Sequence, residues 1–302
     1  MNPTADEAPV PGLDPVAARR WVRLRRDSSP WLHEEVARRM MERLQWFRDP
    51  PASWLHWEPV LGGLEAHRQL VERLPQAQAH VWLEDRGALE RLGLEPARRG
   101  WSRLPWMRQG KALTLADADT TVAMLWANMA LHQVAYPQTL LRQWHRQVEV
   151  GGFLMFSCLG PDSLAELRAV YAREGWPVPA HSFTDMHDWG DMLVHGGFAE
   201  PVMDMERITL TYSNAAAMLG ELRGLGRNLH ADRSPGLRGR DWRQRLEQAI
   251  EQHGARADDG RLRLSFEITY GHAFKAQPRP ARGDSQTVSV DDMRAMLRSR
   301  KP

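Results

Sequence analysis

Short apolar runs alternate with amphipathic stretches over the first half of the chain. The apolar runs cover residues 53–57, 79–83, 122–126 and 153–157 and predict buried strands. The stretches between them repeat their apolar residues with the period of a helix. Strands joined by helix-length connections are typical of a doubly wound α/β fold with a mostly parallel sheet. The pattern therefore predicts that fold class.

The second half of the chain predicts two further strands, at 202–212 and 264–270. Apolar and polar residues alternate in the latter, which predicts a half-exposed antiparallel strand. A helical insertion of about 213–255 separates the two strands. We expect this insertion to cover the carboxyl edge of the sheet.

The two ends of the chain have little apolar periodicity. Residues 1–13 carry three prolines and predict a disordered tail, and 276–302 predict a second tail. The region 14–275 is then one domain, whose first part, about 14–50, predicts an N-terminal helical lid with a helix over 30–47.

Composition excludes several classes of protein. The 302 residues contain 40 basic and 38 acidic side chains, and this balance argues against a nucleic-acid-binding protein. No apolar run is long enough for a membrane helix, and the single cysteine, Cys158, is typical of a reducing compartment. We therefore expect a cytoplasmic protein.

Common catalytic motifs are missing from the sequence. The histidines do not form a His-x-x-x-His helix, so we expect no metal site. Gly110-Lys111 resembles the end of a phosphate-binding loop, but Pro105 stands where the first glycine belongs. A Gly-x-Ser-x-Gly nucleophile elbow is also missing.

Several segments between Asp14 and Lys275 resemble one family, the bacterial malonyl-[acyl-carrier protein] O-methyltransferases of biotin synthesis. That family belongs to the class I methyltransferases, which use S-adenosylmethionine. The segments that carry the resemblance are 125–133 (LWANMALHQ), 141–152 (LRQWHRQVEVGG), 156–164 (FSCLGPDSL), 183–188 (FTDMHD), 193–198 (LVHGGF), 221–228 and 264–272. The resemblance implies a Rossmann-like fold and S-adenosylmethionine as the cofactor.

The family's glycine-rich cofactor loop follows the first strand, and its positions fall on His56, Glu58, Val60 and Gly62, with Gly63 next. Two of the three family glycines are therefore larger residues in this chain, so the cofactor motif is degenerate. The side chain of Glu58 either repels the cofactor's carboxylate or accepts a hydrogen bond from its ammonium group.

The resemblance implies further cofactor-binding residues. Glu84 or Asp85, after the second strand, corresponds to the acid that holds the ribose hydroxyls, although an acid there also suits a helix cap. Asp117 and Asp119 precede the next strand, where the family often has an acid facing the adenine, although a polar turn explains them equally. Asn128 follows a strand end and is expected in the cofactor site and as a catalytic residue.

The family's lid carries an aromatic side chain near the transferred methyl group, and Trp21 or Trp31 is expected to take that role. The implied reaction is methyl transfer to the free carboxylate of a malonyl thioester on acyl carrier protein. Arg19, Arg20, Arg23 and Arg146 are candidates for binding that substrate or its acidic carrier. The degenerate loop leaves an alternative, in which the protein is an inactive relative that acts as a binding or scaffold partner.

Overall fold

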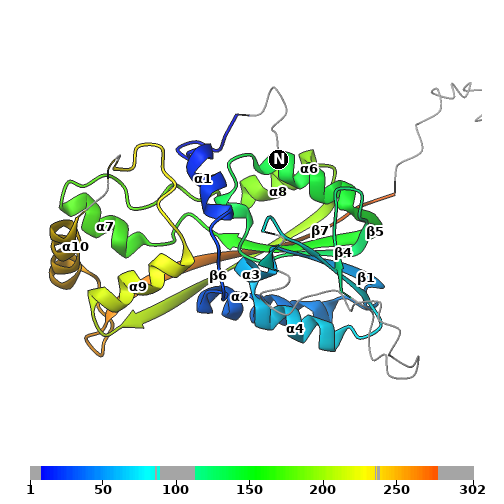
Figure 1. Cartoon of the computed structure of the whole chain (residues 1–302), viewed down its shortest axis with the longest axis horizontal. Helices are drawn as coiled ribbons and strands as arrows, with labels where there is room; N and C mark the ends of the chain where they lie inside the picture. Colours follow the sequence, from blue (N-terminus) through cyan, green and yellow to red (C-terminus); the bar gives the residue numbers. More distant parts are fainter. Residues whose placement is uncertain (1–7, 86, 89–112, 235, 237–238, 278–302) are drawn as a thin grey trace, which may run out of the picture.

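The computed structural model describes residues 8–85, 87–88, 113–234, 236 and 239–277. Within these residues one sheet has the strand order β3-β2-β1-β4-β5-β7-β6, and β7 runs antiparallel to its neighbours β5 and β6 (Figure 1). The strands are β1 (Ser53–Trp57), β2 (Gln78–Trp82), β3 (Thr114–Leu115), β4 (Val122–Ala127), β5 (Val148–Leu159), β6 (Ala199–Tyr212) and β7 (Leu262–Phe274). The prediction of a doubly wound, mostly parallel α/β sheet is confirmed.

Helices cover both faces of the sheet, as in Figure 1. Their bounds are α1 (Pro15–Val22), α2 (Trp31–Arg43), α3 (Pro59–Gly62), α4 (Leu64–Arg73), α6 (Pro137–Gln147), α7 (Ala165–Arg173), α8 (Met186–His195), α9 (Ala215–Leu225) and α10 (Arg240–His253), with short 3-10 helices η1 (Leu44–Trp46) and η3 (Leu131–Gln133).

Alternate residues of each central strand face the two helical layers. Trp54, Met124 and Met155 pack with α2 and α4, while Leu125 and Leu154 pack with α6 and α8. Because both faces are covered, the strands are apolar along their whole length, and this is the pattern that made them recognisable in the sequence.

One prediction about the sheet is wrong. Strand β7 is antiparallel as expected, but it lies between β5 and β6, and its residues are almost all buried rather than half-exposed. Two of the polar residues in its sequence are buried with partners: Ser265 Oγ donates to the Glu166 carboxylate, and the backbone of Glu267 exchanges hydrogen bonds with the Ser163 hydroxyl. The half-exposed strand is β6, at the edge of the sheet.

The structure also corrects the predicted lid and N-terminal tail. Helix α2 packs on a face of the sheet through Leu32, Val36 and Met40, so only α1 lies over the carboxyl edge. The last part of the predicted tail, 10–13, is held by the hydrogen bond from Val10 N–H to the Ala135 carbonyl and by burial of Leu13. The first seven residues and nearly all of 276–302 lie outside the described residues.

The described part of the chain has neither a membrane-spanning helix nor a cluster of metal-ligating side chains. Among its helices, none is both long and apolar enough to span a membrane. In the same residues, histidine, cysteine, aspartate and glutamate side chains do not gather in groups of three or more that suit a metal ion.

Candidate active site

The loop after β1 forms a single helical turn, α3, where the family has glycines. Its first residue, Glu58, adopts a left-handed backbone with φ 53° and ψ 61°. A side chain in this region costs roughly 1–2 kcal/mol, which glycine avoids. The chain thus keeps the backbone geometry of a glycine turn at Glu58 but places a carboxyl group there.

The Glu58 carboxyl lies between the ends of β1 and β2. It accepts a hydrogen bond from the backbone N–H of Glu84 at 2.6 Å, while its own N–H donates to the Trp82 carbonyl at 2.8 Å. Burial raises the pKa of Glu58 to about 7, and the negative charges of Glu84 and Asp85 act in the same direction. The hydrogen bond from Glu84 N–H and the positive charge of Arg26 act in the opposite direction.

The N-terminus of α4, directly after the loop, is already occupied by the protein's own groups. The Ser29 hydroxyl accepts from Leu64 N–H at 2.8 Å, and the Glu34 carboxylate accepts from Glu65 N–H and Ala66 N–H at 3.1 Å each. A helix start is a common place for an anion. Here Glu34 of α2 supplies that anion. The part of the loop that is left for a ligand is therefore the part around Glu58.

Glycine is required at Gly62 and Gly63 by close contacts. A Cβ atom on Gly62 would lie 3.1 Å from both the Asn128 carbonyl oxygen and the His56 Nε2 atom. Gly63 has φ +126°, and a Cβ there would lie 2.9 Å from Glu34. These glycines let the loop, β4 and α2 approach one another.

His56, which occupies the family's acidic position, is fully buried and faces His67 across 3.3 Å between their Nδ1 atoms. Burial lowers the pKa of both side chains, to about 4 for His67. Both rings are therefore neutral at pH 7, and His56 supplies packing rather than the negative charge of the family's acid.

Asn128 is fully buried, and its side-chain amide is used within the protein. The Nδ2 group donates to the carbonyls of His33, at 2.8 Å, and Gly62, and the Oδ1 atom accepts from Ser157 Oγ at 2.6 Å. Asn128 thereby joins α2, the loop and β5 behind the carboxyl edge. We propose that it acts by positioning the loop, and a role in catalysis stays a prediction from the resemblance.

The two lid tryptophans lie in different environments. Trp21 is 4% exposed, and its indole N–H donates to the Gln133 side-chain carbonyl. The guanidinium groups of Arg26 and Arg227 lie 4.2 and 5.3 Å from its ring centroid. Trp31 is 56% exposed at the start of α2. The structure brings Trp21, and not Trp31, into the carboxyl edge.

The predicted acids at the sheet ends lie in separate places. Glu84 and Asp85 follow β2 beside Glu58, and Glu84 forms an ion pair with Arg23 at 3.2 Å. Asp117 accepts from Asp119 N–H in a turn just before β4, and its carbonyl accepts from Gln147, which precedes β5. The Asp117–Asp119 turn therefore lies at the opposite end of β4 from Asn128.

The candidate arginines also lie in two separate places. Arg19 and Arg20 are exposed on α1, near the Arg23–Glu84 pair. Arg146 lies at the end of α6, a helix that returns from the carboxyl edge to the start of β5. The structure thus does not bring Arg146 together with Arg19, Arg20 and Arg23.

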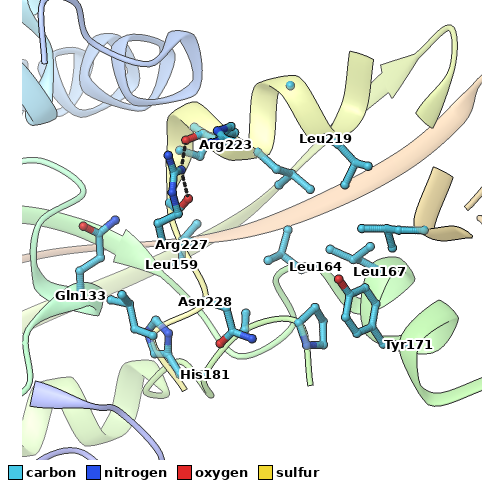
Figure 2. Close-up of a pocket in the computed structure, with 18 of the residues that line it drawn as sticks. Gln133, Leu159, Leu164, Leu167, Tyr171, His181, Leu219, Arg223, Arg227 and Asn228 are labelled. Carbon is cyan, nitrogen blue, oxygen red and sulfur yellow. Dashed lines mark hydrogen bonds between the residues drawn. The ribbon is translucent and has the colours of Figure 1, made fainter. Parts of the chain in front are cut away.

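A cavity of about 680 Å³ adjoins this edge, beyond the ends of β4 and β5. Its lining comes from η3, the end of β5, α7, α9 and α10. In Figure 2 the polar residues Gln133, His181 and Asn228 lie toward one end, while Leu164, Leu167 and Tyr171 lie at the other. The cavity is in the size range of pockets that hold small-molecule ligands.

Sequence reasoning missed the polar residues of this cavity. His132 and Gln133 end the 125–133 segment that carries the resemblance, and Arg227 and Asn228 end the 221–228 segment. The resemblance of these two segments to the family was the sequence signal for the cavity. They lie in distant parts of the chain and meet at this one cavity. His181 had no comparable signal.

Comparisons with known proteins show which family the chain belongs to. No protein-family model matches the chain. Curated relatives named malonyl-[acyl-carrier protein] O-methyltransferase match it closely: one from Laribacter hongkongensis is 37% identical over 85% of this chain and 86% of its own length. Another, from Nitrosospira multiformis, is 40% identical over 84% of this chain and 85% of its own length.

Solved structures agree on the fold. The YcgJ protein of Bacillus subtilis superposes with a TM-score of 0.50 and 9% identity, covering 79% of this chain and 98% of its own. At that identity the likeness concerns the fold alone. Given the relatives, which are similar over most of their length, the chain belongs to the malonyl-[acyl-carrier protein] O-methyltransferase family.

Proposed function

We propose that this protein transfers a methyl group from S-adenosylmethionine to the free carboxylate of a malonyl thioester carried on acyl carrier protein, a step of biotin synthesis. The observation that carries the proposal is the match to relatives of that name over 85% of the chain. The geometry supports it, because an acidic cofactor edge and a ligand-sized cavity lie side by side. We further propose that the protein works in the cytoplasm.

The residues at the ends of β1 and β2 fit this cofactor. S-adenosylmethionine carries an ammonium group and a ribose with two neighbouring hydroxyls. The Glu58 carboxyl, whose pKa is raised by burial and by the neighbouring acids, suits the ammonium. The Glu84 carboxylate at the end of β2 suits the hydroxyls, and Arg23 holds it by an ion pair. When bound, the cofactor supplies an electrophilic methyl group.

The protein's own part in the reaction is to position the acceptor and exclude water. A carboxylate is already a nucleophile at neutral pH, so a general base is unnecessary. Trp21 packs with Leu13, Leu61 and Leu229 over the edge and closes it with apolar side chains. The Trp21–Gln133 hydrogen bond joins this cover to the cavity wall, so the acceptor's position is fixed relative to the loop.

The direct test is methylation of malonyl-acyl carrier protein, followed by mass spectrometry of the carrier. We expect a mass gain of one methyl group on malonyl-carrier and none on acetyl-carrier, which lacks the free carboxylate. Equal labelling of both carriers, or of neither, contradicts the proposed acceptor.

Cofactor binding is tested separately by calorimetric titration with S-adenosylhomocysteine. We expect micromolar affinity, and about tenfold weaker binding by Glu58→Gln, because the amide cannot neutralise the ammonium. Tighter binding by the variant would mean that the carboxylate repels the ligand. Failure of the folded wild-type protein to bind at millimolar ligand would favour the inactive alternative.

A further inference from the structure

The cavity beside the active edge is much larger than the acyl group of the proposed substrate. A malonyl group is far smaller than the drug-sized ligands that pockets of this volume hold. Most of the lining is apolar and comes from residues such as Leu164, Leu167, Leu219 and Leu246. A charged malonyl carboxylate does not need such walls, so another part of the acceptor must fill them.

Two buried histidines in the cavity lining have fixed and opposite hydrogen-bonding roles. His181 Nε2 lies 2.8 Å from the His132 carbonyl oxygen, which can only accept, so Nε2 carries the proton. Burial lowers the pKa of His181, and the ring is neutral. Its Nδ1 atom is therefore a bare acceptor, and no partner for it exists among the described residues.

His132 has the reverse arrangement. The Trp21 indole N–H can only donate, so the Gln133 side chain turns its oxygen to Trp21 and its amino group to His132 Nε2, 3.1 Å away. Because that nitrogen accepts, the proton of the neutral His132 ring is on Nδ1, which also lacks a partner among the described residues. The cavity lining thus holds one unpaired donor and one unpaired acceptor, in side chains 6% and 3% exposed.

A secondary amide, with one carbonyl and one N–H group, satisfies such a pair. We infer that this cavity binds the pantetheine arm of the thioester, with an amide of the arm between His132 and His181 and its dimethyl segment among the leucines. The inference rests on the proposed function for the identity of the arm. Two exposed arginines of the cavity lining, Arg223 and Arg240, are suited to the phosphate that ends the arm.

The test is calorimetric titration with pantetheine itself, which binds without any methyl transfer. We expect pantetheine to bind at least tenfold more tightly than an analogue whose two amides are esters, because an ester cannot donate to His181. In the variant His181→Phe this preference is expected to disappear, whereas His80→Phe, on β2 away from the cavity, is expected to keep it. Equal binding of pantetheine and the ester analogue by wild type overturns the inference.

A second variant covers the possibility that His181→Phe does not fold. Leu219→Trp fills the apolar end of the cavity, and we expect it to weaken pantetheine binding at least tenfold while S-adenosylhomocysteine affinity stays within twofold. The matched control is Val194→Trp, an exposed position of α8, and we expect both affinities to be unchanged. Unaltered pantetheine binding by Leu219→Trp places the ligand elsewhere and overturns the inference.

Failure of the inference differs from failure of the proposed function. Methylation of malonyl-carrier by a protein that does not bind pantetheine would overturn the inference alone. Pantetheine binding that follows the expected pattern, without methylation of malonyl-carrier, would support the inferred cavity and contradict the proposed reaction.

Discussion

The Glu58 carboxyl accepts a hydrogen bond from the backbone N–H of Glu84 at 2.6 Å and so joins the ends of β1 and β2. Burial raises the pKa of Glu58 to about 7 in the folded protein, against an ordinary value near 4.5. Between these values the folded chain holds a proton that the unfolded chain has lost. The contribution of Glu58 to stability therefore falls as the pH rises from about 4.5 to about 7.

The variant Glu58→Gln removes this titration. We expect its free energy of unfolding to exceed that of wild type by about 2 kcal/mol at pH 8, with the difference shrinking toward pH 5. Urea unfolding at pH 5, 6, 7 and 8 measures it. A constant difference across this range would show that Glu58 does not titrate there.

Replacement of Asn128 by alanine should be costly, because it leaves the carbonyls of His33 and Gly62 without their buried donor. We expect a loss of about 3 kcal/mol in the free energy of unfolding. The matched control, Asn214→Ala at the exposed N-cap of α9, should lose about 1 kcal/mol. Equal losses in the two variants would argue against a special role for the Asn128 amide.

The two lid tryptophans should respond differently to replacement by phenylalanine. Trp21→Phe keeps an aromatic ring beside Arg26 and Arg227 but leaves the Gln133 carbonyl unpaired, at a cost of about 1–2 kcal/mol. We also expect a lower kcat/KM for the carrier substrate. Trp31→Phe changes an exposed ring and should alter neither quantity. A larger effect on kcat/KM from Trp31 would reverse the assignment of the lid aromatic.

His67 should make the protein sensitive to acid. Burial lowers its pKa to about 4, so below pH 6.5 the unfolded chain binds a proton that the folded chain does not. Stability then falls as the pH drops from about 6.5 to about 4, by about 3 kcal/mol from this residue. His67→Asn should flatten that decline in thermal melts at pH 4 to 7. Parallel curves for the two proteins would place the acid sensitivity elsewhere.

Arg19 and Arg20 of α1, together with Arg23 directly after it, are the proposed contact with the acidic carrier. Reversing the charge of Arg19, Arg20 and Arg23 together should weaken carrier binding about tenfold or more and reduce its dependence on salt. Arg48→Glu, just before β1 at the other edge of the sheet, is the control and should bind as wild type does. Surface plasmon resonance at two salt concentrations measures both, and unchanged binding by the triple variant removes α1 from the interface.

Much of the fold could be predicted because burial on both faces leaves a strong apolar signal. The expected run 53–57 coincides with β1, and 122–126 differs from β4 by one residue. The exposure of β7 could not be predicted in this way. Its alternation resembles that of a half-exposed strand, and the hydrogen bonds that Ser163 and Glu166 form with Glu267 and Ser265 come from segments far away in the sequence.

The candidate site was predictable as a place but not as a set of contacts. Position at a strand end pointed to Asn128, yet its three side-chain partners lie 29, 66 and 95 residues away in the sequence, so its structural use could not be foreseen. The cavity is a stronger example. Its walls come from segments that precede β6 in the sequence and from segments that follow it. No local sequence pattern therefore relates His132 to Leu219.

The anchoring of residues 10–13 determines where the folded unit can be shortened. A cut at Asp14, which the proline-rich composition suggests, removes Leu13 from its cluster with Trp21 and also the carbonyl of Gly12 that accepts from Ala231 N–H. Helix α1, which closes the edge, would then lose the contacts before its N-terminus and be held from its C-terminal end only. A shortened protein that keeps its sheet intact should therefore lose its cover, and residue 8 is a safer starting point for recombinant production than residue 14.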